Sequence, residues 1–379
     1  MSNERLCITF FSSGNTSERA ALDPIAREAE RRGYETTFSA DVTDRAEIGV
    51  YNTHVYPDDT VSADQSVVLM NSVDDGYDSE YFWRERWNRF DVGLLSGEAV
   101  GEHWQSVSGN KYALPKRGVY VVGWPKSDWV HTETFARAVE DLRGDIELAD
   151  GRTAVYAPAE ESAGKMVEFL DAADGVVDTM LIKHKGDEDY SQIREREFQG
   201  ELIILDHDRD IFEALALADV LISEQSSVLP EALHTKTFPI SVIDWPVTFS
   251  SGTRYPGDTL PEFVETTTRE ELSSTIERFY DGDLILDIEG LRDRHFAHPG
   301  QSARIAMDVI EQVAVADGNH PSRVTETGEF PGNSNRDLYY SYLRAAAEKS
   351  LPPAIKKWLL EFGAGQFMMK LDDVLLNHD

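Results

Sequence analysis

Short apolar runs alternate with stretches of helical periodicity along the first part of the chain. The apolar runs predict strands at residues 6–11, 36–39, 66–70, 91–95 and 118–122. The periodic stretches predict helices at residues 18–32, 80–90, 98–107 and 132–142. Strands that alternate with helices indicate a parallel sheet with helices on both faces.

The alternation starts again after a polar stretch at residues 143–151, which we interpret as the crossing between two domains. Further strands are predicted at residues 153–157, 180–183, 202–205, 220–223 and 239–243. Helices are predicted near residues 162–172, 189–198, 211–218, 229–234, 269–280 and 301–313. The fold class is therefore α/β, with two Rossmann-like domains at residues 1–145 and 151–315 that face each other across a cleft. Ligands of such sheets bind beyond the carboxyl ends of the strands.

The last segment, residues 336–379, has a helical pattern and predicts a helical tail. Within residues 353–371 four apolar side chains recur at helical spacing, with Lys356 and Lys357 beside them: Ile355, Trp358, Leu359 and Phe362. This amphipathic stretch either packs on the protein itself or lies on an anionic membrane surface.

Composition narrows the function classes. The 379 residues carry 36 Lys and Arg against 69 Asp and Glu, a net charge of −33. Such a chain repels nucleic acid, which we exclude as a partner. The charge indicates either an acidic interaction surface or adaptation to a salt-rich cytoplasm. Because the acids are scattered and only 11 of the basic residues are Lys, we favour the second explanation.

The cytoplasm is also the compartment that the remaining features favour. The N-terminus lacks the basic start of a signal peptide, and no apolar run is long enough for a membrane span. Cys7 is the single cysteine, which excludes an internal disulfide and a cysteine-rich zinc site. The histidines show no metal-ligand spacing, and we expect neither a metal nor a cofactor.

The most informative motif is the strand at residues 220–223, which ends in Ser226-Ser227 directly before a helix. Backbone N–H groups at a helix start favour an anion, and the serine hydroxyls add donors. Glu231, one turn later, is placed to accept from ribose hydroxyls. The alternative is that a serine only caps the helix and that Glu231 is solvated.

Three other segments carry candidate phosphate ligands. Lys183, His184 and Lys185 follow a predicted strand, and His184 can also donate a proton. Lys126 lies in a Gly-Trp-Pro-Lys-Ser-Asp turn after another strand, where it either meets the ligand or pairs with an acid. Arg304 lies on the helix after His298-Pro299-Gly300 and has the same two alternatives.

In this order the segments resemble the CDP-glycerol glycerophosphotransferase family, the teichoic-acid-type polymerases and primases. The family's G-Y-P-R-N-D corresponds to residues 123–128, and its A-D-x-L-I-T-D-Y-S-S to residues 218–227. Its Y-A-P-T, R-x-H-P and D-G-x-A-x-x-R correspond more loosely to residues 155–159, 182–185 and 299–304. The resemblance covers about residues 60–312.

The resemblance implies a GT-B fold and the transfer of glycerol phosphate from CDP-glycerol to a hydroxyl of a lipid-linked or polymeric acceptor, with release of CMP. The family's catalytic His-Gly-Thr element is absent. Its place is taken by residues 68–76, where Asp74 or Asp75 can accept a proton. The alternatives are a sugar-nucleotide glycosyltransferase or epimerase, and a non-catalytic nucleotide-binding partner in surface-polymer assembly.

Overall fold

The computed structural model describes residues 6–328 except 15, 53–59, 71, 74–80, 85, 159–165, 184–192, 194–196, 207, 225, 245–246, 250–251 and 255–262. In the first half of the chain these residues form a six-stranded sheet in the order β2-β1-β3-β4-β5-β6. All five strand pairs are parallel. The elements of this half are β1(Cys7–Phe11), α1(Thr16–Arg32), β2(Glu35–Ser39), β3(Ala46–Tyr51), β4(Ala63–Leu69), α2(Tyr81–Arg84), η2(Trp87–Arg89), β5(Val92–Leu95), α3(Glu98–Val107), β6(Val119–Val121), η3(Pro125–His131) and α4(Glu133–Asp145).

The sequence analysis missed β3. Gly49 interrupts its apolar run, and Glu47 adds a charge, so the segment does not look like a buried strand. The glycine is required by packing, because a Cβ at this position would lie 2.7 Å from the ring of Tyr51 and 3.0 Å from the ring of Phe11. Those two rings stack at 4.3 Å in the core of the first half.

The second half forms another six-stranded parallel sheet, in the order β14-β11-β10-β7-β8-β9. The chain order reverses between β7 and β10, which is the topological switch point of a Rossmann fold. The elements of this half are β7(Thr153–Tyr156), α5(Met166–Ala173), β8(Thr179–Ile182), β9(Glu201–Ile204), α7(Ile211–Leu217), β10(Val220–Ser223), α8(Val228–Glu231), η5(Ala232–His234), β11(Phe238–Val242), β12(Val247–Phe249), β13(Gly252–Arg254), β14(Glu265–Thr267) and α9(Leu272–Tyr280).

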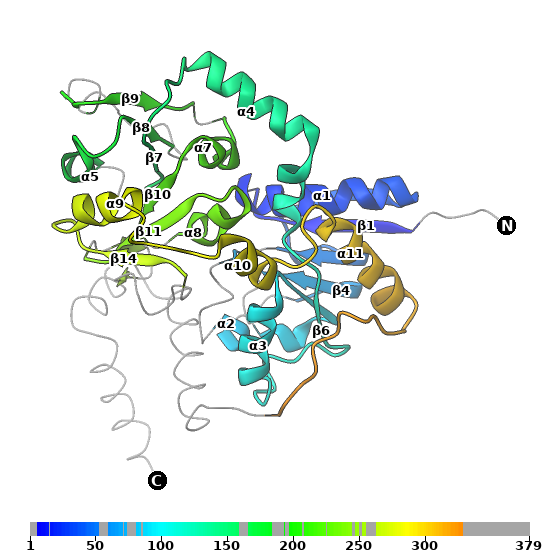
Figure 1. Ribbon diagram of the computed structural model, residues 1–379. Helices are drawn as coiled ribbons and strands as arrows, with labels where there is room; N and C mark the ends of the chain where they lie inside the picture. Colours follow the sequence, from blue (N-terminus) through cyan, green and yellow to red (C-terminus); the bar gives the residue numbers. More distant parts are fainter. Residues whose placement is uncertain are drawn as a thin grey trace, which may run out of the picture.

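The chain then returns to the first half through α10(Ile288–His295), α11(Ser302–Val309) and η6(Ile310–Val315). Figure 1 shows α11 beside α1, far from the second sheet, and contacts between these two helices agree. Arg32 of α1 forms ion pairs with Asp308 at 2.8 Å and Glu311 at 2.6 Å. The predicted helix at residues 301–313 therefore exists, but it covers the first sheet.

One apolar cluster runs through both halves. It contains Phe10 of β1, Trp124 before η3, Phe212 of α7, Leu221 of β10 and Phe296 after α10, each buried. The two halves thus share a continuous core at the place where they meet.

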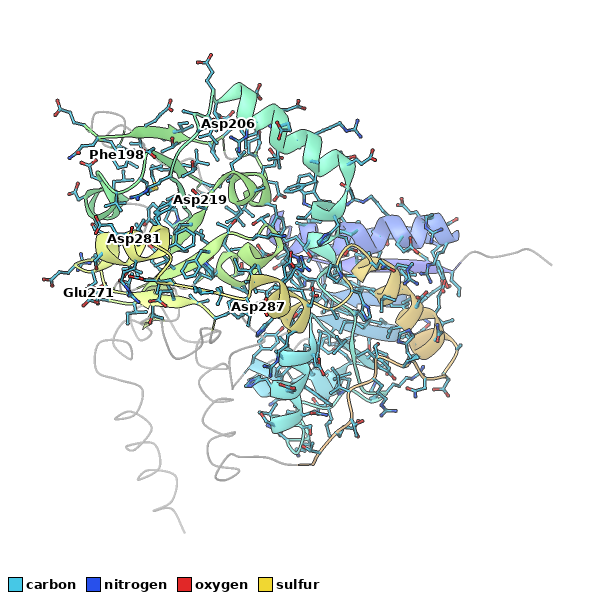
Figure 2. All side chains as sticks on the ribbon, viewed as in Figure 1. Phe198, Asp206, Asp219, Glu271, Asp281 and Asp287 are labelled. Atoms are coloured by element: carbon cyan, nitrogen blue, oxygen red, sulfur yellow. The ribbon has the colours of Figure 1, made fainter. Side chains whose placement is uncertain are left out.

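The α/β architecture with two Rossmann-like sheets is confirmed, while the domain limits at 145 and 151 stay a prediction. The tail at residues 336–379, with its amphipathic stretch 353–371, lies outside the described residues. Among the described helices, none combines the length and apolar character needed to cross a membrane. Figure 2 shows the described side chains, and the acids labelled in it come from separate segments of the chain: Asp206, Asp219, Glu271, Asp281 and Asp287.

Candidate functional site

Polar side chains gather at the carboxyl ends of β7 and β10, the switch point of the second sheet. The hydroxyl of Tyr156 donates to the carboxylate of Glu224 at 3.1 Å, and the Ser223 hydroxyl donates to the carbonyl of Ala157 at 2.7 Å. Glu224 is fully buried. Burial raises the pKa of Tyr156, with Glu224 adding to the effect, so the phenol keeps the proton that it donates. These bonds fix the backbone that leads into the serine turn.

The serine turn follows β10 directly and begins α8. The Ser226 hydroxyl accepts a hydrogen bond from the N–H of Val228 at 3.4 Å, a weak version of the expected cap. Ser227 precedes the first helical residue without a capping bond from its side chain. Both serines are half-buried. The structure therefore assigns the weak cap to Ser226 and leaves the Ser227 hydroxyl uninvolved in capping.

Glu231 forms a charged contact between the two halves. Its carboxylate accepts from Lys126 Nζ at 2.9 and 2.8 Å and from Trp124 Nε1 at 3.0 Å. The Lys126 side chain is 13% exposed and that of Glu231 2%. The alternative of a solvated Glu231 is wrong, because Glu231 is buried. For Lys126 the structure shows the alternative of pairing with an acid, here on the opposite half of the molecule.

Asp210 is a site residue that the sequence analysis missed. It precedes α7, and its carboxylate accepts from the N–H of Phe212 at 2.8 Å. Burial raises the pKa of the Asp210 carboxyl, while Lys126 lowers it, Glu231 raises it and Lys183 lowers it. Asp210 thus lies within electrostatic reach of three residues that the sequence singled out. The available signal was an aspartate between a strand end and a helix, but capping alone accounts for that pattern.

Lys183 follows β8 and is only 7% exposed. Its N–H donates to the carbonyl of Tyr156 at 3.0 Å, which places it next to β7 at the same edge as the serine turn. His184, Lys185, Asp74 and Asp75 lie outside the described residues.

Asp128 and Arg304 belong to the contact between η3 and α11. The Asp128 carboxylate accepts from the N–H groups of Ser302 at 2.9 Å and Ala303 at 2.7 Å, so it caps α11 from a distant part of the chain. Arg304 donates to Asp308 at 3.0 Å and to Gln301 at 2.8 Å. Asp128 thus caps α11, which is distant in the sequence, while the next helix, α4, is capped by Thr132. Arg304 pairs with an acid of its own helix.

Buried histidines lie close to the contact between the two halves around Glu231 and Lys126, which we call the seam. His234 is 5% exposed, its ring lies 4.2 Å from that of Phe296 and 6.0 Å from that of His131. Within the described part of the chain neither of its ring nitrogens has a hydrogen-bond partner. Burial lowers the pKa of His234 well below its usual value and lowers that of His295 to about 4. Both rings are therefore neutral at pH 7. No group of three or more potential metal ligands occurs among the residues described.

Comparison with known proteins identifies the fold. No protein-family profile matches the chain, and no curated protein matches its sequence. A variant of the wall teichoic acid polymerase TagF soaked with CDPG matches with a TM-score of 0.53 at 15% identity, over 80% of this chain and 88% of that chain. The S. aureus MnaA–UDP structure matches with 0.53 at 12% identity, over 81% and 96%.

A third match is the UDP-GlcNAc 2-epimerase from Neisseria meningitidis bound to UDP-GlcNAc, with a TM-score of 0.51 at 10% identity, over 80% of this chain and 99% of that chain. The structural similarity establishes the fold, whereas identities this low leave the substrate open. The chain has a GT-B-like fold of two Rossmann-like domains, distantly similar to a teichoic acid polymerase and to UDP-GlcNAc 2-epimerases.

Proposed function

We propose that the protein is a transferase that moves glycerol phosphate from CDP-glycerol to a hydroxyl of a lipid-linked or polymeric cell-surface acceptor. The observation that carries this proposal is the serine turn at the β7/β10 switch point, with Lys183 at the same edge and Lys126 beside the helix that follows. A switch point is where Rossmann folds bind nucleotides, and two lysines with two hydroxyls suit a diphosphate.

In this proposal Ser226, Ser227, Lys126 and Lys183 hold the donor diphosphate. His184 and Lys185 are proposed as further phosphate ligands on the strength of the sequence motifs. Arg304 is left out, because its helix packs on α1 of the first half and its guanidinium pairs with Asp308 there. Glu231 remains a predicted ligand of the ribose, although its carboxylate is already engaged at the seam.

The chemistry is a displacement at the phosphorus that carries glycerol. The acceptor hydroxyl oxygen attacks, the new P–O bond forms as the bond to the CMP oxygen breaks, and CMP leaves. The hydroxyl proton passes to a carboxylate, for which we propose Asp74 or Asp75. Fixed positive charges stabilise the developing charge, so positioning and electrostatics supply most of the catalysis.

A second candidate is an enzyme that uses a UDP-sugar. It is favoured by the similarity to structures titled as complexes with UDP and UDP-GlcNAc. A third candidate, a non-catalytic nucleotide-binding component, is favoured by the absence of the family's His-Gly-Thr element.

One assay at molar KCl separates the three. The protein is incubated with CDP-glycerol and a lipid acceptor, or with a UDP-sugar, and nucleotide release is followed by ³¹P NMR. We expect CMP from CDP-glycerol. Turnover of the UDP-sugar alone supports the second candidate. Binding without turnover, unchanged by Asp74→Asn and Asp75→Asn, supports the third.

The site assignment is tested in the same assay. Ser227→Ala is expected to weaken donor binding, whereas Ser274→Ala, on the exposed side of α9, is the matched control and keeps wild-type affinity. Wild-type affinity in Ser227→Ala would remove the serine turn from the proposal.

We also propose that the protein works in the cytoplasm at the inner membrane face, with residues 353–371 in contact with anionic lipid near the acceptor. Sedimentation with anionic and with neutral vesicles tests this, and equal recovery with both would contradict it.

A further inference from the structure

Among the described residues, the hydrogen bonds to the Glu231 carboxylate all come from the other half of the molecule. Trp124 and Lys126 lie after β6 in the first half and donate the hydrogen bonds, while Glu231 ends α8 in the second. A buried carboxylate needs such partners, because leaving it unpaired costs several kilocalories per mole. In the resting protein the positive charge of Lys126 is therefore neutralised at the seam.

The pair lies beside the serine turn. The N–H of Glu231 donates to the carbonyl of Ser227 at 3.3 Å, an i to i+4 bond of helical geometry. Side chains four residues apart lie on the same face of a helix, with their Cβ atoms roughly 5–6 Å apart. Glu231, which binds the ammonium, therefore lies one helical turn after Ser227.

The surroundings of Lys126 limit where its charge can go. Its ammonium lies 5.3 Å from the ring centre of Phe212, at the start of α7. Asp210 is close enough for the two charges to interact. A lysine ammonium has three donors on a flexible stem, so it can exchange one acceptor for another over a short distance.

We infer that Glu231 is a positioning residue. It binds the ammonium of Lys126 at the seam in the resting protein and releases it to a diphosphate that binds at the serine turn. This inference rests on the proposed function, because it needs an anionic ligand at that turn. Phosphate oxygens and the Glu231 carboxylate compete for the same donors. Transfer leaves Glu231 with the hydrogen bond from Trp124 but without its counter-charge, so it loosens the contact between the halves at the expense of donor affinity. Donor binding and the relative position of the halves are thereby coupled.

The probe is inorganic pyrophosphate, which contains no ribose and reports on phosphate binding alone. Affinities are measured by isothermal titration calorimetry at low and at molar KCl. We expect Glu231→Gln to bind pyrophosphate several-fold more tightly than the wild type, since Lys126 no longer has a charged competitor. In Lys126→Met/Glu231→Gln the gain disappears, and affinity falls about tenfold below the wild type, the size of one charge-assisted hydrogen bond.

A matched control is Glu213→Gln. Glu213 is also a buried acid, but its partner is Arg209 at 3.3 Å. Its loss changes the nearby charge by the same amount and leaves Lys126 paired, so the pyrophosphate affinity is expected to stay at the wild-type value. If Glu231→Gln does not fold, Glu231→Asp retracts the carboxylate from Lys126 and is expected to tighten binding in the same direction.

The outcomes separate this inference from the proposed function. Wild-type protein that binds neither pyrophosphate nor CDP-glycerol overturns both. Wild-type binding with equal or weaker affinity in Glu231→Gln overturns the inference alone. A gain that persists when Lys126 is Met, or that Glu213→Gln reproduces, also overturns it, because the effect would then be one of general charge.

Discussion

Breaking the Lys126–Glu231 pair is the sharpest test of how the halves are joined. In Lys126→Met the carboxylate of Glu231, 2% exposed, keeps Trp124 as its one remaining donor among the contacts described. Removing one partner of a buried ion pair costs about 3–5 kcal/mol, because the other charge stays buried without compensation. The same pair replaced by neutral groups of similar shape is close to neutral or even stabilising. Lys126→Met/Glu231→Gln is therefore expected to recover most of the lost stability.

The assay is equilibrium unfolding in urea at molar KCl, followed by tryptophan fluorescence and circular dichroism, with the free energy taken from midpoint and slope. Lys236→Met serves as the control, since Lys236 and its partner Glu289 are both about 60% exposed, at 62% and 63%. An exposed pair is screened by salt, and this variant should match the wild type. The reasoning is refuted if Lys126→Met is as stable as the wild type, or if the double variant is no more stable than the single one.

Three further predictions concern residues near the contact between the halves. The pKa of His295 in the folded protein, about 4, lies below the ordinary value near 6.5, so its contribution to stability is complete above pH 6.5 and is lost as the pH falls toward 4. The free energy of unfolding in urea should therefore be about 2 kcal/mol lower at pH 5 than at pH 7, and His295→Gln should reduce this difference. Asp128→Ala removes the cap of α11 and should lower the unfolding free energy by about 1 kcal/mol in urea unfolding followed by circular dichroism. Gln312→Ala, at an exposed position of the adjoining η6, is the comparison and should match the wild type. Gly123→Ala should lower the melting temperature, because φ is 97° there and a Cβ would lie 2.2 Å from the carbonyl oxygen of Ala297; an unchanged melting temperature would contradict this close approach.

The periodicity of the sequence was sufficient for most of the two sheets, because buried parallel strands are short apolar runs between amphipathic helices. It failed where tertiary packing decides the residue type. Gly49 lies in β3 because two aromatic rings occupy the space of its side chain. The helix α10, rich in charged residues, carries too weak an apolar stripe to be recognised, although its His295 is buried.

The candidate site could be located from the sequence only in part. A strand followed by two serines and a helix indicates an edge that binds anions, and topology puts that edge at the switch point. The contacts between the halves could not be predicted from the sequence, since no local pattern indicates that Glu231 binds Lys126, 105 residues earlier in the chain. Asp210 was missed for the same reason: its neighbours come from distant segments, and its own pattern is that of a helix cap.

The central claim is that the switch-point edge of the second half binds the diphosphate of a nucleotide-activated donor. A crystal structure of the protein soaked with CDP-glycerol tests it most directly. We expect diphosphate density within hydrogen-bond distance of Ser226 or Ser227, with the Lys126 ammonium turned toward a phosphate oxygen. Nucleotide bound at another surface, with the serine turn empty and Lys126 still on Glu231, would contradict it.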